Sequence, residues 1–386
     1  MARLGDICKF QSGGTPSKCK SDYFGGNIPW VTTVVLNGGI ISSVDAVEWI
    51  TEAAILQSAA KIVPQNSIMV GTRVGIGKVA INSVPMATNQ DIISLLDIDA
   101  ERWDKRFLCH FILAKNNFLL SQARGATIKG IKIDVLSNLQ VPNISITEQR
   151  KIAAVLDKVS DLIAKRRQQL DKLDEMVKSR FVEMFGDPVA NPMGWPVHRF
   201  SEYIEFLTSG SRGWSKYFSD DGEYFITIKN VKNCRITVGD VQHVIPPNNA
   251  EAKRTKVQEG DLLISITADL GRTGVVSKEI AAHGGYINQH LTCIRIKKDS
   301  LNPLYVAHYM ESDSGKAQFQ SKNQSAVKAG LNFNSINSLL LFIPPLDLQN
   351  VFVDFVEQTE RTKTAINNSQ KKLKMLKKAL MNKYFK

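Results

Sequence analysis

The sequence has few of the features that mark exported, membrane-spanning or metal-bound proteins. Its five cysteines are scattered, and no two have the C-x-x-C spacing of a zinc or redox motif. No apolar run approaches the ~18 residues that a membrane span needs, and LLLFI at 339–343 is among the longest. The N-terminal MARLGDICKF lacks the apolar core of a signal peptide. These absences predict a soluble, cytoplasmic protein with reduced cysteines.

Motifs of common enzyme classes are also missing. GIGKVA at 75–80 resembles a dinucleotide fingerprint, but strand-like VAINSV follows it where a helix is required. The same stretch fails as a phosphate-binding loop, because Thr72 replaces the first glycine and Val79 replaces the magnesium-binding Ser or Thr. Neither H-E-x-x-H nor G-x-S-x-G occurs. We therefore expect no catalytic chemistry in this chain.

Positive charge is in excess. The chain has 49 Lys and Arg against 37 Asp and Glu, which gives a net charge of +12. Such a balance favours a polyanionic partner such as nucleic acid, although a ribosome-associated or membrane-surface protein would show the same sign.

The chain contains an internal repeat. Six segments recur 195 to 200 positions further on: 3–14 with 199–210, 28–33 with 224–229, 61–81 with 256–276, Asn89-Gln90 with Asn288-Gln289, 107–111 with 305–309, and 130–149 with 330–349. A repeat of this size indicates two copies of one structural unit. His110 and His308 fall at equivalent positions inside apolar stretches. We interpret both as packed side chains rather than metal ligands.

Each half ends in a long helical pattern. Apolar residues recur there at alternating spacings of four and three, which is typical of a coiled-coil seam. A helix of this length cannot be covered by one small domain, so each helix is expected to pair with the other. The positions predicted to pair the helices are Ile152, Leu156, Val159, Ile163, Leu170, Leu173 and Val177 in the first helix, and Phe352, Val356, Ile366, Leu373, Leu376 and Leu380 in the second. The lysine-rich stretch at 371–378 is a solvated face, a phosphate-binding face or a partner surface.

These patterns predict an α+β fold with a pseudo-two-fold internal repeat. Two similar domains of mixed, mainly antiparallel strands and short helices are separated by two long antiparallel helices that form a coiled coil. The predicted parts are a first domain at 1–146, a central helix at 147–186, a second domain at 187–346 and a C-terminal helix at 347–386.

Three segments resemble a known family. They are GATIKGIKIDVLSNLQVPNISITEQRKIAAVLD (125–157), SAVKAGLNFNSINSLLLFIPPLDLQNVFVDFVE (325–357) and the helix exit SRFVEMFGDPVANPMGW (179–195). Together they resemble the specificity subunits of type I restriction-modification systems, and the resemblance covers essentially the whole chain. Two departures affect a turn only: the first copy lacks the usual double proline, and the second has no Glu before Gln349.

The resemblance implies two target-recognition domains, each of which reads one half of a bipartite DNA sequence. It implies that the paired helices set the unread spacer and dock two modification (methyltransferase) subunits, which bring S-adenosylmethionine and methylate adenine N6. Two restriction (motor-nuclease) subunits would bring ATP and Mg²⁺. This chain is expected to hold no cofactor, no metal and no catalytic residue of its own.

Polar loops of the two domains supply the candidate DNA contacts. Arg and Lys pair with guanine, Asn and Gln with adenine, while phosphate contacts position the protein. The candidates are Ser12, Thr15, Ser17, Lys18, Lys20, Thr72, Arg73, Lys78, Arg124, Thr127 and Lys129 in the first half, and Ser209, Ser211, Arg212, Trp214, Lys216, Thr267, Arg272, Thr273, Gln324 and Lys328 in the second. Because the first loops of the two halves differ in sequence, we predict two different half-sites and an asymmetric target.

Two other functions remain open from the sequence. One is a free-standing regulator with the same scaffold and no methyltransferase partner, which co-purification would distinguish. The other is an enzyme, for instance a nuclease with dispersed carboxylates. Magnesium-dependent cleavage by the isolated chain would favour that second function.

Overall fold

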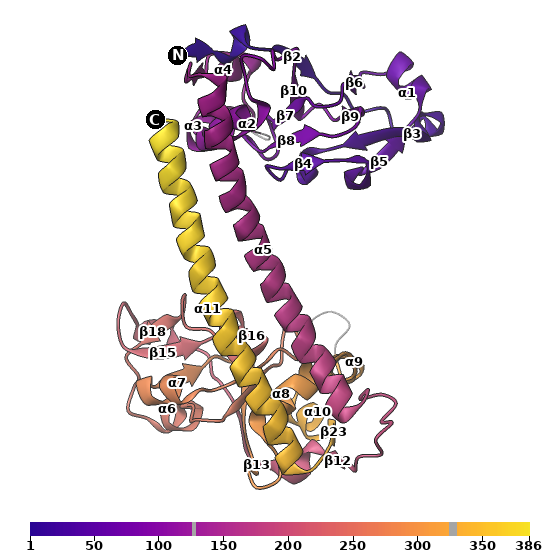
Figure 1. Ribbon diagram of the computed structural model, residues 1–386. Helices are drawn as coiled ribbons and strands as arrows, with labels where there is room; N and C mark the ends of the chain where they lie inside the picture. The colour runs from indigo at the N-terminus through magenta and orange to yellow at the C-terminus, as the bar shows by residue number, and fades with distance from the viewer. Residues whose placement is uncertain (126–128, 324–329) are drawn as a thin grey trace. The chain divides into compact units, whose positions relative to one another are not determined.

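The computed structural model describes residues 1–125, 129–323 and 330–386 and divides into two compact units (Figure 1). Unit 1 comprises Met1–Arg167 and Asn367–Lys386, and unit 2 comprises Gln168–Ile366. The predicted boundaries treated the two long helices as separate parts. In the structure each helix is instead divided between the units, so both units contain a segment of both helices.

Unit 1 is built on two sheets. The larger one has the order β2-β10-β7-β8-β4, in which β4 is the strand parallel to its neighbour. Its central strands are apolar and buried on both faces, as strands are when both sides of a sheet are covered. The smaller sheet has the order β5-β3-β9-β6, and β1 pairs with β11. The strand bounds are β1 (Ala2–Arg3), β2 (Lys9–Ser12), β3 (Phe24–Val31), β4 (Ile40–Ile41), β5 (Glu48–Ile50), β6 (Ile62–Val63), β7 (Ile68–Gly71), β8 (Val79–Asn82), β9 (Met86–Thr88), β10 (Ile92–Leu96) and β11 (Gln140–Val141).

The helices of unit 1 pack on both sheets, α2 against the larger one and α1 against the smaller one. The central one, α2, begins where the side chain of Asp104 accepts a hydrogen bond from the backbone N–H of Phe107. Phe107 and Phe111 of α2 are fully buried and contact the ring of Phe385, with centroids 5.2 and 5.9 Å apart. The helix bounds are α1 (Glu52–Gln57), α2 (Lys105–Ala114), α3 (Asn116–Ser121), α4 (Ile133–Ser137), and parts of the long helices α5 (Ile146–Phe185) and α11 (Leu346–Tyr384).

Unit 2 repeats this arrangement. Its larger sheet has the order β13-β22-β19-β20-β17-β16, its smaller sheet β14-β18-β15-β21, and β12 pairs with β23. The strands are β12 (Val197–Arg199), β13 (Ile204–Ser209), β14 (Phe218–Ser219), β15 (Glu223–Ile226), β16 (Val231–Lys232), β17 (Cys234–Ile236), β18 (Gln242–Val244), β19 (Leu262–Ser265), β20 (Thr273–Val275), β21 (Gly285–Ile287), β22 (Leu291–Ile296) and β23 (Leu340–Phe342). The helices are α6 (Ala250–Thr255), α7 (Lys278–His283), α8 (Pro303–Glu311), α9 (Asp313–Ser321) and α10 (Phe333–Asn337). The predicted fold class and internal repeat are confirmed.

Phenylalanines near the ends of the long helices enter the cores. In unit 2 the buried ring of Phe185 lies 4.9 Å from Tyr305 and 5.5 Å from Phe352, measured between centroids. In unit 1 Phe385 packs against α2 in the same way. Each unit is therefore completed by the last residues of one long helix.

A buried glutamine ties the start of each long helix to its unit. The Gln149 amide donates to the carbonyl oxygens of Ile144 and Arg102, at 2.9 and 3.0 Å, and accepts from the N–H of Asp104 at 3.0 Å. Gln349 makes the same three bonds, to Pro344, Ser300 and Asn302, at 2.8, 3.1 and 2.9 Å. Both glutamines have zero exposed surface. Each amide thus satisfies backbone groups at the junction of helix and domain.

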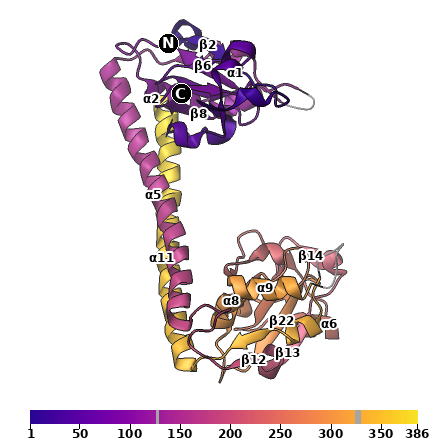
Figure 2. The ribbon, with the colours of Figure 1, turned by 90° about the vertical axis from the view of Figure 1, so that its right-hand side faces the viewer.

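Within each unit the segments of α5 and α11 lie side by side and run antiparallel (Figures 1 and 2). The apolar stripe serves the domain cores as well as the helix pair. Ile152 and Leu156 join the core of unit 1, and Val177, Phe352 and Val356 join the core of unit 2. Leu376 is 47% exposed, so its predicted pairing role is wrong.

Polar contacts hold the helices together between those apolar ends. In unit 2 the Lys363 ammonium lies 2.5 Å from Asp174 of α5 and 2.6 Å from Glu360. In unit 1 the Gln370 amide donates to the carbonyl of Ile163 at 3.4 Å. Polar side chains in the middle of α11 are therefore joined to α5 by hydrogen bonds and an ion pair.

The two equivalent histidines have different surroundings. His110 is 1% exposed, and its Nε2 lies 2.8 Å from Asp157, which also pairs with Arg106. Burial raises the pKa of the Asp157 carboxyl, but the hydrogen bonds from His110 and Arg106 outweigh it and hold that pKa well below its usual range. His308 instead packs against the ring of Phe352, and burial lowers its pKa to about 3. Both are packed residues, as the sequence indicated.

Candidate nucleic-acid interface

In unit 1 four polar segments meet where strands of the two sheets end. The segment after β2 approaches the segment after β9: the N–H of Gly13 donates to Ile92 and that of Gly14 to Thr88, at 3.1 and 2.8 Å. The Thr15 hydroxyl donates to the side-chain oxygen of Gln90. The first loop is thereby fastened to residues 88–92.

The other two segments join through Thr72. Its N–H donates to the carbonyl of Asp91 at 2.8 Å, and its own carbonyl accepts from Ile131 N–H at 2.8 Å. Arg124 and Gly130 form a bridge of two 2.9 Å backbone bonds beside it. We call the segments 12–15, 72–78, 89–91 and 124–130, as far as they are described, the four-segment cluster of unit 1.

Unit 2 has the same cluster, built from segments around 209–211, 266–272, 288–290 and 330–331. The N–H of Gly210 donates to Leu291 at 3.1 Å, and Ser211 forms a bridge with Asn288. The N–H of Ile266 donates to His290 at 3.0 Å and its carbonyl accepts from Leu331 at 2.9 Å. The backbone bonds of Gly210, Ile266 and Leu331 match those of Gly13, Thr72 and Ile131 in unit 1.

Glycine is required where the first loop crosses. A Cβ on Gly13 would lie 2.2 Å from the carbonyl oxygen of Asn89, and one on Gly210 would lie 2.1 Å from that of Asn288. Any side chain at either position would force the two segments apart. The glycine at the centre of Ser-Gly-Gly in unit 1 and of Ser-Gly-Ser in unit 2 therefore allows the backbones of the two segments to approach closely.

The matched bonds also correct the alignment of the repeat in this loop. The sequence comparison set 61–81 against 256–276, which pairs Thr72 with Thr267. The backbone bonds instead pair Thr72 with Ile266. The N–H of each donates to the carbonyl of the residue that follows the repeated Asn-Gln, which is Asp91 or His290. The carbonyl of each accepts from the residue that follows the equivalent glycine, Gly130 or Gly330. Arg73 is therefore equivalent to Thr267, one residue away from the alignment suggested by sequence.

Most candidate contact residues lie on the surface of these loops. The exposed ones are Ser12, Thr15, Ser17, Lys18, Lys20, Arg73, Lys78, Arg124, Lys129, Arg212 and Lys216, and the partly exposed ones are Ser209, Ser211, Thr267 and Arg272. The clusters bring together Thr15, Arg73 and Arg124 in unit 1, and Ser211 and Thr267 in unit 2. Lys20 turns away to donate to the Tyr23 hydroxyl at 2.9 Å. Thr127, Gln324 and Lys328 lie outside the described residues.

Three candidates are buried, and their assignment as contact residues is corrected. Trp214 is 4% exposed and packs between the rings of Phe225 and Tyr286, with centroids 5.4 and 5.0 Å away. Thr72 is 4% exposed, and its hydroxyl donates to the carbonyl of Asp91 at 3.1 Å. Thr273, the third, is fully buried. Side chains in such surroundings stabilise the loops and do not face a ligand.

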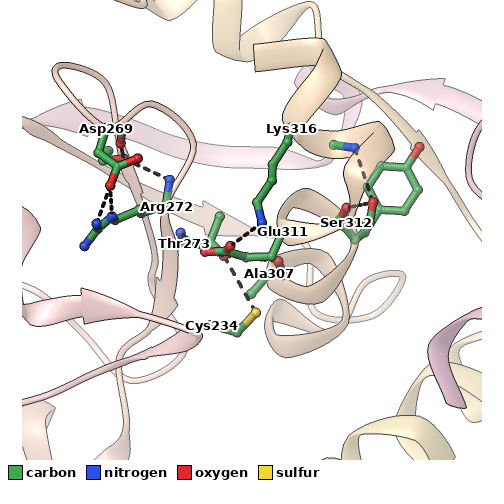
Figure 3. A network of polar contacts seen from close by, with 11 residues as sticks. Cys234, Asp269, Arg272, Thr273, Ala307, Glu311, Ser312 and Lys316 are labelled. Carbon is green, nitrogen blue, oxygen red and sulfur yellow. Dashed lines mark hydrogen bonds and ion pairs between the residues drawn. The ribbon is translucent and has the colours of Figure 1, made fainter. Parts of the chain in front are cut away.

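Figure 3 shows how Thr273 is held. Its N–H donates to Glu311 at 2.9 Å, and its hydroxyl donates to the carbonyl of Ala307 at 3.1 Å. Lys316 pairs with the other oxygen of Glu311 at 3.5 Å. The neighbouring Arg272 points away from this network and pairs with Asp269, three residues earlier.

The residues at the centre of each cluster were not among the contacts predicted from the sequence. In unit 1 Gln90 contacts Thr15 of the first loop and Asp91 contacts Thr72 of the second, and in unit 2 His290 contacts Thr267 and Gln289. The recurring Asn-Gln dipeptide was visible as a repeat marker. Its polar character inside otherwise strand-like segments was the signal that could have assigned it to the interface.

Two general properties of the described residues bear on function. No three His, Cys, Asp or Glu residues within ranges 1–125, 129–323 and 330–386 are placed to hold a metal ion. Over the same ranges, no helix has the length and apolar character to cross a bilayer.

Comparisons with known proteins show what the whole chain resembles. The family model described as the type I restriction modification DNA specificity domain matches residues 1–174 and 194–376. The specificity subunit of the type I restriction enzyme MjaIX from Methanocaldococcus jannaschii is 28% identical over 247 residues, which cover 59% of this chain and 57% of that protein. The EcoR124I/EcoR124II specificity subunit of Escherichia coli is 33% identical over 166 residues, covering 41% of this chain and 40% of that one.

A solved structure matches over the full length. The crystal structure of a type I restriction-modification S subunit from M. genitalium covers 100% of this chain and 95% of its own, with a TM-score of 0.60 and 14% sequence identity. At that identity the likeness shows the fold alone.

Proposed function

The chain belongs to the type I restriction modification DNA specificity family, and from this premise we propose that it reads a bipartite, asymmetric DNA target. Each unit would read one half through its four-segment cluster, and the bases between the halves would remain unread. The chain itself carries no catalysis. Methyl transfer and cleavage belong to partner subunits that bring S-adenosylmethionine, ATP and Mg²⁺.

The observation that carries the proposal is the duplication of the cluster with different side chains. The backbone bonds of the two clusters match, whereas the polar groups on them do not: Arg73 and Asp91 in unit 1 stand where unit 2 has Thr267 and His290. Identical frames would place both clusters against DNA in the same way, and different side chains would select different bases.

The excess of basic residues supports DNA as the ligand. The cluster surface of unit 1 exposes Arg73, Lys78, Arg124 and Lys129, and nearby Lys18 is also exposed. Exposed cations that contact DNA neutralise phosphates and make binding dependent on salt concentration. The predicted contacts at Lys18 and Lys129 are phosphate contacts in this proposal, because a single ammonium carries little sequence information.

The long helices are proposed to dock two modification subunits and to set the spacer. Apolar side chains are exposed on both helices, among them Val155 at 43% and Val182 at 50% on α5 and Met375 at 73% on α11. In this proposal the modification subunits cover these side chains. Two motor-nuclease subunits would then join through the modification subunits, in the cytoplasm.

Mapping of methylated adenines tests the proposal. Cells that carry this chain with its modification subunits are expected to methylate a motif of two short defined halves at a fixed separation. Exchange of residues 1–146 for those of a relative should change one half only, and exchange of 187–346 should change the other. A motif without two halves, or a change of both halves by one exchange, would contradict the proposal.

A further inference from the structure

The equivalent positions 73 and 267 carry the largest chemical difference between the two clusters. Arg73 has a side chain that is 53% exposed, and its Nη1 lies 3.9 Å from Oδ1 of Asp91, which is 16% exposed. In unit 2 the Thr267 hydroxyl lies 2.7 Å from Nδ1 of His290. The ion pair of Arg73 and Asp91 in unit 1 is thus replaced in unit 2 by the hydroxyl of Thr267 and the imidazole of His290.

The surroundings fix Asp91 more firmly than Arg73. Oδ2 of Asp91 accepts a hydrogen bond from the Asn89 amide at 3.0 Å, and its carbonyl oxygen accepts from the N–H and the hydroxyl of Thr72, at 2.8 and 3.1 Å. The carboxylate is therefore held in place on the cluster floor. Arg73 extends above it toward solvent, next to Gly130, where an added Cβ would come within 3.0 Å of Arg73 Cγ.

An arginine so placed has a specific chemistry toward DNA. The guanidinium offers N–H donors only, in a planar fork that matches O6 and N7 of guanine. A fixed carboxylate behind the guanidinium limits its rotation and so reduces the entropy lost on binding. The hydroxyl and imidazole of unit 2 can each donate or accept, and threonine contacts do not require guanine.

We propose that Arg73, positioned by Asp91, reads a guanine in the half-site of unit 1, and that the equivalent pair Thr267–His290 makes the half-site of unit 2 independent of guanine at the corresponding position. This inference rests on the proposed function and adds the base class that distinguishes the two halves. Arg73 is the specificity-determining residue, and Asp91 is a positioning residue that acts through it.

Selection of DNA from a pool of random-sequence duplexes by the full 386-residue chain tests the inference. The unaltered protein is expected to enrich a two-part motif with a guanine in one half. Arg73→Lys keeps the charge and loses the planar fork, so we expect the preference for that guanine to fall roughly 10- to 100-fold with the rest of the motif unchanged. Arg73→Gln should lose it to a similar extent.

The matched control is Thr267→Val, which removes the hydroxyl at the equivalent position and keeps the shape. It is expected to leave the guanine of the first half unchanged and to alter the other half only. Asp91→Asn should reduce the guanine preference less than the Arg73 variants do. It should leave the affinity for nonspecific competitor DNA unchanged. Replacement of the guanine by 7-deazaguanine, which lacks the N7 acceptor, should weaken binding of the unaltered protein more than binding of Arg73→Lys.

The possible outcomes distinguish failure of the proposed function from failure of the assignment of Arg73. If the unaltered chain enriches no two-part motif, the proposed function fails and the inference fails with it. If it enriches such a motif but the Arg73 variants retain the guanine, or change both halves, the assignment of Arg73 is overturned while the proposed function stands.

Discussion

The two units use different contacts to attach their short helices α2 and α8 to the long helices α5 and α11. In unit 1 Arg106 and His110 of α2 converge on Asp157 of α5, a half-buried ionic cluster. In unit 2 the equivalent helix α8 has buried Leu304 in place of Arg106, and His308 faces the ring of Phe352. The position corresponding to Asp157 is the exposed Glu357. The equivalent helices thus keep their places in the repeat, while the histidine contact with the long helix moves from Asp157 to Phe352, the position that corresponds to Ile152.

The aromatic ends of the long helices provide the largest expected effect. Phe185→Ala should reduce the free energy of unfolding by about 3–5 kcal/mol, because it empties a site lined by Phe181, Tyr305 and Phe352. Phe385→Ala should cost less, since its ring meets only two others among the described contacts. Urea unfolding measures both.

Hydrogen exchange then shows where each variant acts. Phe185→Ala is expected to lower protection in α8 and Phe385→Ala in α2, because each ring packs within a single unit. Equal loss of protection in both helices from either variant would contradict the independence of the two cores.

The ionic cluster of unit 1 provides the next effect. Asp157→Asn leaves the guanidinium of Arg106 without its counter-charge, and we expect a loss of about 2–3 kcal/mol in urea unfolding. This is less than for a fully buried pair, because Arg106 and Asp157 are 24% and 30% exposed. The matched control Glu357→Gln, at the exposed equivalent position, should change stability by less than about 0.5 kcal/mol. Similar losses from both variants would remove the contrast between the units.

Acid should affect the units in sequence. Burial lowers the pKa of His308 to about 3, so the unfolded chain takes up this proton first. The stability from the neutral imidazole is therefore complete above pH 6.5 and is lost as the pH falls from there toward 3. The pKa of Asp157 is held below its usual range, so its contribution is lost only below about pH 4.

Unfolding measured between pH 7 and pH 5 checks this order. We expect a loss of about 1–2 kcal/mol, with a slope of at most ~1.4 kcal/mol per pH unit for one proton. His308→Gln should flatten the slope, because it removes the group whose pKa burial lowers. An unchanged slope in His308→Gln would show that another group controls the acid response.

The smallest expected difference concerns the equivalent cations Lys78 and Arg272. Lys78 is exposed, while Arg272 already pairs with Asp269. Lys78→Ala should lower the salt dependence of DNA binding by about one phosphate contact, and Arg272→Ala by less. Binding titrations at several salt concentrations measure the two slopes. A larger change from Arg272→Ala would place the phosphate contact in unit 2 instead.

Much of the architecture could be predicted from the sequence because it depends on periodic and repeated features. The long apolar stripes and the recurring segments were sufficient for two similar domains and two long helices. The loops around Ser12, Thr72 and Ser209 were recognised from their polar composition. Within each unit, these loops contact the segments around 89–91 or 288–290, which resembled ordinary strands in the sequence.

The remainder depends on contacts that a linear pattern does not contain. Trp214 looked like a loop residue, but distant Phe225 and Tyr286 bury it. The one-residue shift that makes Arg73 equivalent to Thr267 became apparent only from backbone bonds across strands. Leu376 follows the helical stripe and yet remains exposed. The stripe defines one face of the helix, but it does not show how much of that face other side chains cover.

The buried amides of Gln149 and Gln349 have a mechanical consequence. Three hydrogen bonds from one side chain restrain both the position and the rotation of the first helical turn. A pull or torque applied along α5 or α11 would therefore be transmitted at once to the backbone just before α2 or α8. Glutamate in place of either glutamine would oppose a negative oxygen to two carbonyl oxygens and loosen this joint, so that the helix could turn without its domain following.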